Sequence, residues 1–163
     1  MRFLDRLEKL AGIIGAAGGE IVGKTKIQKL IFLAQEKGFY LGYDYAYHHY
    51  GVFSPDLESD LRLGEAFDFF TIEETLGQGN PTKTSLVAPE EYAYSDSDDP
   101  ALKMVRELAS KRSRVLEVLS TMVYLKNMRY EGEEFENNLV ALKGHLREFF
   151  DEARELFRLH FAD

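Results

Sequence analysis

The 163-residue sequence contains no cysteine. This absence excludes disulfide bonds, thiolate metal sites and a cysteine nucleophile, and it fits a reducing compartment. No apolar run approaches the roughly 18 residues of a membrane-spanning helix, so we expect no membrane partner. The first ten residues carry charges every few positions, unlike a secretory signal peptide. From these absences we expect a cytoplasmic protein.

Basic residues are scarce in the middle of the chain. Residues 41–100 contain two Lys/Arg against thirteen Asp/Glu, a net charge of −11. Residues 1–40 carry a net charge of +3, and residues 101–163 have no net charge. The middle of the chain should therefore repel phosphate, whereas the N-terminal part could attract it.

Patterns of metal ligands and catalytic groups are missing as well. His48 and His49 are neighbours on an expected strand and point to opposite faces, and His145 lies fifteen residues from His160. The ligand spacings of zinc sites are absent, adjacent acidic pairs lie in polar surroundings that do not suit a general acid, and no Ser-His-Asp arrangement is seen. We expect no metal, no cofactor and no catalytic residue, hence no enzyme.

Helical periodicity is present in the first third of the chain. Apolar residues recur at helical spacing in residues 3–16, and glycines end that helix. After a short extended piece at 20–22, residues 24–37 are apolar over most of a helical circumference, which is typical of a core helix. A third helix is expected at 54–64, with Ser54 as its N-cap and Pro55 as its first residue.

Strand-like patterns surround the third helix. Aromatic residues alternate in Tyr43–Tyr50, which predicts a strand. Residues 51–55 are expected to form a turn. The segments 68–76 and 83–88 flank a glycine-rich stretch at 77–81 and predict a β-hairpin.

The C-terminal part is expected to be helical. Residues 91–99 are acidic and predict a linker, and residues 100–163 form a helical extension after a domain at 1–90. Its last helix is expected to run unbroken over 133–161, because apolar residues from Phe135 to His160 keep a heptad spacing. Such a seam could pack on its own domain or support a homodimer.

The order helix, strand, helix, strand-like turn, helix and hairpin is the winged-helix arrangement, so we expect an α+β, mostly helical fold. Three segments carry a family resemblance: KIQKLIFLAQ (26–35), YHHYGVFSPDLESDL (47–61) and VLEVLSTMVYL (115–125). With these motifs the chain resembles the YwgA-like family of bacterial and archaeal proteins. More distantly it is similar to the Panacea (SocA-like antitoxin) domain. The resemblance implies a winged-helix-like regulatory or interaction module.

The function expected first is nucleic-acid contact by a transcription-regulator-like protein. The third helix of a standard winged helix enters the major groove, but here residues 54–65 carry a net charge of −3. The second helix is basic instead. Duplex DNA would therefore be held in an unusual mode by the lysines of the second helix, Lys24, Lys26, Lys29 and Lys37.

Two alternatives remain open from the residues. The acidic surface of residues 54–99, represented by Asp56, Glu58 and Asp60, could bind a basic protein partner in an antitoxin-like way. Residues 18–25 also fit GxxxxGK[ST], the letters of a nucleotide-binding P-loop. A true P-loop follows a buried strand, whereas here an amphipathic helix comes first, so nucleotide binding is the remote alternative.

Overall fold

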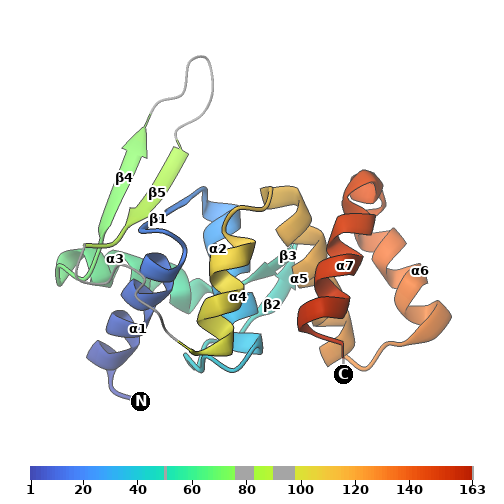
Figure 1. The fold of residues 1–163 in the computed structure, drawn as a ribbon, viewed down its shortest axis with the longest axis horizontal. Helices are drawn as coiled ribbons and strands as arrows, with labels where there is room; N and C mark the ends of the chain where they lie inside the picture. The colour runs from blue at the N-terminus through green and yellow to red at the C-terminus, as the bar shows by residue number, and fades with distance from the viewer. Residues whose placement is uncertain (50, 76–82, 90–97, 163) are drawn as a thin grey trace.

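The computed structural model describes residues 1–49, 51–75, 83–89 and 98–162 of an α+β, mostly helical chain (Figure 1). The helices are α1 (Phe3–Ala16), α2 (Lys24–Glu36), α3 (Pro55–Ala66), α4 (Pro100–Leu108), α5 (Ser113–Asn127), α6 (Gly132–Lys143), the 3-10 helix η2 (Gly144–Phe149) and α7 (Phe150–His160). The strands are β1 (Glu20–Val22), β2 (Ala46–His48), β3 (Gly51–Phe53), β4 (Thr71–Thr75) and β5 (Lys83–Val87). None of the helices in these ranges is long and apolar enough to cross a membrane.

A three-stranded antiparallel sheet in the order β1-β5-β4 stands at one end of the molecule, beside α1 and α3 (Figure 1). The β4–β5 hairpin confirms the expected one, whose tip at 77–81 lies outside the described residues. The order α1, β1, α2, α3, β4, β5 agrees with a winged helix, with the β2–β3 hairpin inserted between α2 and α3. The winged-helix resemblance itself stays a prediction.

Helix α2 lies at the centre of the fold, as its wide apolar face predicts. It packs against α4 and α5, and also contacts α1 and β3. Its buried stretch is unbroken, from Ile27 to Ala34, and includes the polar Gln28 and Lys29. A helix surrounded on all sides leaves no room for solvent along this stretch, so these two polar side chains need partners inside the protein.

The starts of α3 and α4 form by side-chain capping, which the sequence predicted for α3. The Ser54 hydroxyl accepts a hydrogen bond from the Leu57 amide at 3.3 Å, with proline in the first turn. The Asp99 carboxylate accepts one from the Ala101 amide at 2.8 Å. The side-chain oxygens thus satisfy amides that have no partner within their helices.

The strand expected over Tyr43–Tyr50 is shorter than predicted, and the turn expected at 51–55 is partly a strand. Among residues 43–49, the part of this segment that the structure describes, Ala46–His48 pairs, and its partner is Gly51–Phe53. Tyr43 has no strand partner because the Gln35 side chain bonds both its amide and its carbonyl, at 3.0 and 2.7 Å. The Gln35 side chain, on α2, thus makes the backbone hydrogen bonds that a neighbouring strand would otherwise make with Tyr43.

The unbroken helix predicted over residues 133–161 is wrong. The chain leaves the α-helix after Lys143, passes through η2 and folds back as α7 (Figure 1). Arg154 on α7 forms a bidentate ion pair with Glu136 on α6, both contacts at 2.6 Å, which fixes the two helices side by side. Gly144 follows the break, and glycine is the weakest helix former after proline.

The heptad residues consequently face their own chain. Leu139, Leu146, Ala153 and Leu156 are buried in the core, where α5 packs against both α6 and α7. Homodimerisation through Phe135–His160 stays a prediction for light scattering, but most of the seam it would use is buried within its own chain, with Leu142 exposed. The acidic linker expected at 91–99 lies outside the described residues up to position 97.

Candidate functional site

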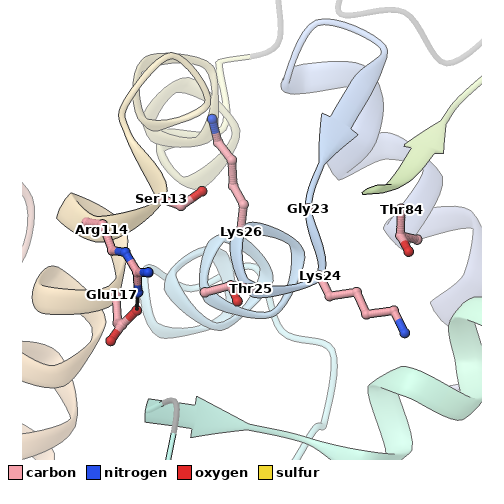
Figure 2. A pocket seen from close by; sticks show the side chains of 8 residues that line it. All are labelled: Gly23, Lys24, Thr25, Lys26, Thr84, Ser113, Arg114 and Glu117. Atoms are coloured by element: carbon pink, nitrogen blue, oxygen red, sulfur yellow. Dashed lines mark hydrogen bonds and ion pairs between the residues drawn. The ribbon is translucent and has the colours of Figure 1, made fainter. Parts of the chain in front are cut away.

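A hollow of about 370 Å³ opens at the start of α2 (Figure 2). We call it the basic hollow. The first turn of α2, one residue of β5 and the first turns of α5 form its walls. Its lining residues are Gly23, Lys24, Thr25, Lys26, Thr84, Ser113, Arg114 and Glu117.

Three cationic side chains line the basic hollow. Figure 2 shows Lys26 extending toward the start of α5 and Lys24 extending the opposite way, away from Ser113 and Arg114. Lys24 is exposed, and Arg114 has 59% of its side chain exposed. Lys26 donates a hydrogen bond to the Lys111 carbonyl at 2.9 Å, and burial lowers its pKa. The hollow therefore presents exposed positive charge from Lys24 and Arg114 beside a half-buried, hydrogen-bonded charge at Lys26.

Two helix N-termini also open onto the basic hollow. Gly23 precedes α2 with φ +102°, and Arg112 precedes α5. Within the described ranges, neither of these residues caps its helix with a side-chain hydrogen bond. Uncapped amide groups and the positive ends of two helix dipoles favour an anion at this place.

The basic segment Lys111-Arg112-Ser113-Arg114 is a part of the site that sequence reasoning missed. It lies in the C-terminal region, which has no net charge, so regional charge counts conceal it. A scan for short basic runs would have found it. What no scan could show is that the Lys26–Lys111 hydrogen bond joins this segment to the start of α2.

Only two of the four lysines predicted to contact nucleic acid lie at the basic hollow. Lys24 and Lys26 line it, but Lys29 is only 2% exposed and donates to the Val52 carbonyl at 2.8 Å. Lys37 donates to the His160 carbonyl near the far end of α2. The prediction is wrong for Lys29, because a buried ammonium cannot reach a phosphate backbone, and Lys37 belongs to a different region.

A buried charge cluster lies next to the basic hollow. Glu117 accepts hydrogen bonds from Lys143 at 2.7 Å and from Arg114 at 3.2 Å. Lys29 lies deeper, and burial lowers its pKa to about 8 against the opposing effect of the Glu117 carboxylate. At Gly51, with φ +98°, an added Cβ would come within 3.5 Å of the Lys29 ammonium. Glycine thus lets β3 pass closely over the buried lysine.

The residues of the P-loop-like motif do not form a phosphate loop. The residues in the middle of the motif, Glu20–Val22, form strand β1, which pairs antiparallel with β5. Their backbone amides therefore lie along a sheet instead of converging on one point. Within the part of the chain that the structure describes, no group of three or more His, Asp or Glu side chains is arranged to hold a metal ion.

The three acidic residues predicted to bind a partner differ in their surroundings. Asp56 is exposed and Glu58 is half-buried. Asp60 is buried and accepts hydrogen bonds from Arg6 Nε and the Tyr43 hydroxyl, both at 2.6 Å. Its contacts tie α1 and the segment before β2 to α3, so the prediction of a surface role for Asp60 is wrong.

Comparison with known proteins gives one relative that covers most of the chain. No protein-family model matches. The chain is 29% identical over 142 residues to "Uncharacterized protein YwgA" of Bacillus subtilis strain 168. The aligned region covers 83% of this chain and 84% of that protein. An alignment of this extent spans the residues of both hairpins and of most helices. The similarity therefore supports a YwgA-like family for this chain, as the motifs indicated.

Proposed function

We propose that this protein is a non-catalytic regulatory module that binds nucleic acid through the phosphate backbone, with the basic hollow as its contact. The observation that carries the proposal is the hydrogen bond from Lys26 to the Lys111 carbonyl. It joins two basic segments, residues 24–26 and 111–114, that are far apart in the sequence. Together with the two helix N-termini, they form a surface suited to phosphate.

The pose differs from that of a standard winged helix, whose third helix enters the major groove. Here α3 exposes Asp56 and Glu65, and β4 beside it exposes Glu73 and Glu74. This side of the molecule repels DNA, so the duplex would lie against the starts of α2 and α5 with α3 away from it. Phosphate contacts of this kind give affinity with little sequence preference.

Fluorescence anisotropy with a labelled duplex of mixed sequence, titrated at several salt concentrations, tests this proposal. The logarithm of the binding constant should fall linearly with the logarithm of salt, by about 0.9 per phosphate contact. We expect the Lys24→Ala/Arg114→Ala variant to bind more weakly and to flatten that slope by about 2. The matched control is Lys103→Ala, an exposed lysine of α4 outside the hollow. Equal slopes in the double variant and the wild type would refute the proposal.

The second candidate is an antitoxin-like module that binds a basic protein, in keeping with the resemblance to the Panacea domain. The observation that favours it is a surface on α3 and β4 where apolar and acidic side chains are exposed together. Leu63 is 40% and Phe67 is 55% exposed, and the exposed acids around them are Asp56, Glu65, Asp68, Glu73 and Glu74. Apolar anchors with an acidic surround suit a basic amphipathic partner.

Co-purification from native extract at low salt tests the second candidate. A basic protein should be retained by the wild type and lost with Asp56→Lys/Phe67→Ser. The matched control carries Glu133→Lys, which changes an exposed acid on α6. If the same proteins are retained by all three forms, the acidic surface is not the contact.

A further inference from the structure

A second hollow, of about 670 Å³, shares Arg114 and Glu117 with the basic hollow. Its size lies within the range of small-molecule sites, roughly 300–1,000 Å³. Its walls come from the β2 region on one side and from α6 and η2 on the other. Its other lining residues are Tyr47, His48, His49, Ala141, Leu142, His145, Leu146, Glu148 and Phe149.

One side of the second hollow is apolar because the helix breaks at Lys143. The heptad pattern predicts Leu142 as a buried position, yet Leu142 is 38% exposed and Lys143 is buried. The break thus turns a leucine outward into the hollow, next to the half-buried Phe149. An aromatic or branched apolar group could pack against these two side chains.

Arg114, on α5, also lines the second hollow, together with the carboxylates of Glu117 and Glu148. Arg114 contacts Glu117 through one nitrogen at 3.2 Å, and its side chain is largely exposed. A guanidinium has five N–H donors, so this single contact leaves donors that can pair with a carboxylate in the hollow.

The buried charges beneath the second hollow add to this preference. Lys29 and Lys143 are both buried around the single carboxylate of Glu117. Two ammonium groups and one carboxylate leave an excess positive charge in surroundings with little solvent. A nearby anion would stabilise that excess, whereas a cation in the hollow would be repelled by it.

We propose that the second hollow binds a small organic anion, a carboxylate carried on an aromatic or branched apolar body. The carboxylate pairs with Arg114, and the body packs against Leu142 and Phe149. This ligand site shares Arg114 with the basic hollow, and it would give the protein a small-molecule ligand in addition to the function proposed above.

A titration with phenylacetate, followed by amide chemical shifts of the ¹⁵N-labelled full chain, tests the ligand site. Phenylacetamide is the matched probe, because it has the same ring and a neutral amide in place of the carboxylate. We expect phenylacetate to shift amides at residues 47–49, 114–117 and 141–149, with at least tenfold higher affinity than phenylacetamide. A dissociation constant on the order of 10 mM is the weakest expected for a ligand with so few atoms. The proposal would therefore be overturned if no amide in these segments shifts at up to about 10 mM probe. Equal affinity for the two probes would also overturn it.

Two pairs of variants locate the ligand. Arg114→Met should weaken phenylacetate binding at least tenfold, whereas Arg62→Met, an exposed arginine on α3, should leave it unchanged. Leu142→Asp should also weaken binding at least tenfold, whereas Leu159→Asp, on the 64% exposed Leu159 of α7, should not. All four side chains are exposed, so the variants should fold. Wild-type affinity for phenylacetate in Arg114→Met or Leu142→Asp would refute the site.

Discussion

Gln28 and Ser54 are joined by two reciprocal hydrogen bonds. The Gln28 side-chain amide donates to the Ser54 carbonyl at 3.1 Å, and the Ser54 backbone amide donates to the Gln28 side-chain oxygen at 3.0 Å. The two residues lie in the two motifs that suggested the family, 26–35 and 47–61. The paired motifs thus describe one contact, in which α2 fixes the start of α3.

Replacing Gln28 with leucine should destabilise the fold markedly. The change leaves the backbone amide of buried Ser54 without its partner, at about 1–3 kcal/mol for a buried group. The Ser54 carbonyl loses one of two donors and keeps the Glu58 amide at 3.3 Å. We expect the free energy of unfolding to fall by about 1–3 kcal/mol, measured by urea denaturation. Asn137→Leu, an exposed polar-to-apolar change on α6, should change it by less than about 0.5 kcal/mol. Similar small effects for both variants would contradict the role given to Gln28.

Asp60 and Asp56 should respond differently to the same substitution. Asp60→Asn removes the charge that pairs with Arg6 inside the protein, so we expect a loss of about 1–3 kcal/mol. Asp56→Asn neutralises an exposed carboxylate on the same helix and should cost about 0.5 kcal/mol or less. Thermal and urea unfolding of the two variants measure this difference. An Asp60→Asn protein as stable as Asp56→Asn would show that the Arg6–Asp60 pair is not structural.

The stability of the wild type should rise with pH between about 8 and 10 because of Lys29. Burial lowers the pKa of Lys29 from 10.5 to about 8; nearby Glu117 opposes this effect and Lys143 adds to it. Between these pH values the unfolded chain keeps the proton that the folded protein has released, so the unfolded state binds more protons and stability increases with pH. The full shift corresponds to about 3 kcal/mol, which is an upper limit for the rise.

To isolate the effect of Lys29, the unfolding free energies of the wild type and of Lys29→Met are measured from pH 7.5 to pH 10. We expect the unfolding free energy of the wild type, relative to that of Lys29→Met, to rise by about 1–3 kcal/mol over this range. Burial raises the pKa of Tyr43, Tyr45 and Tyr47, which destabilises the fold above about pH 10, but both proteins share these tyrosines. Parallel pH curves for the two proteins would mean that Lys29 does not titrate in this range.

Lys143 and Glu117 should show strong coupling in a double-mutant cycle. Lys143→Met alone removes one cationic partner of a buried carboxylate, so we expect a loss of about 3–5 kcal/mol. The Lys143→Met/Glu117→Gln protein should lose less than the sum of the single changes, by at least about 1 kcal/mol. Urea denaturation of the four proteins provides the measurement. Additive losses would show that the two side chains do not depend on each other.

The sequence predicted the elements whose cause is local. Ser54-Pro55 and Asp99-Pro100 carry helix starts in adjacent residues, and glycines after Ala16 end α1. The alternation of Tyr43, Tyr45 and Tyr47 predicted a strand, and Ala46–His48 within that segment is one.

The rest depends on contacts between distant residues. Lys29 resembles its surface neighbours Lys24 and Lys26 in the sequence, and only the Val52 carbonyl and Glu117 explain its burial. The heptad spacing continues across the break after Lys143, so no pattern signals that this lysine turns inward to Glu117. The sequence pointed to one part of the basic hollow, Lys24 and Lys26. It did not point to the other part, which residues 111–114 supply.

Amide chemical-shift mapping with an unlabelled DNA duplex tests the central proposal most directly. At low salt, the account predicts shifts at residues 23–26 and 111–114 that disappear as salt is raised, with α3 little affected. Shifts concentrated on α3 and the β4–β5 hairpin would instead indicate a standard winged-helix pose. Those shifts, or an absence of any shift at the basic hollow, would contradict the account.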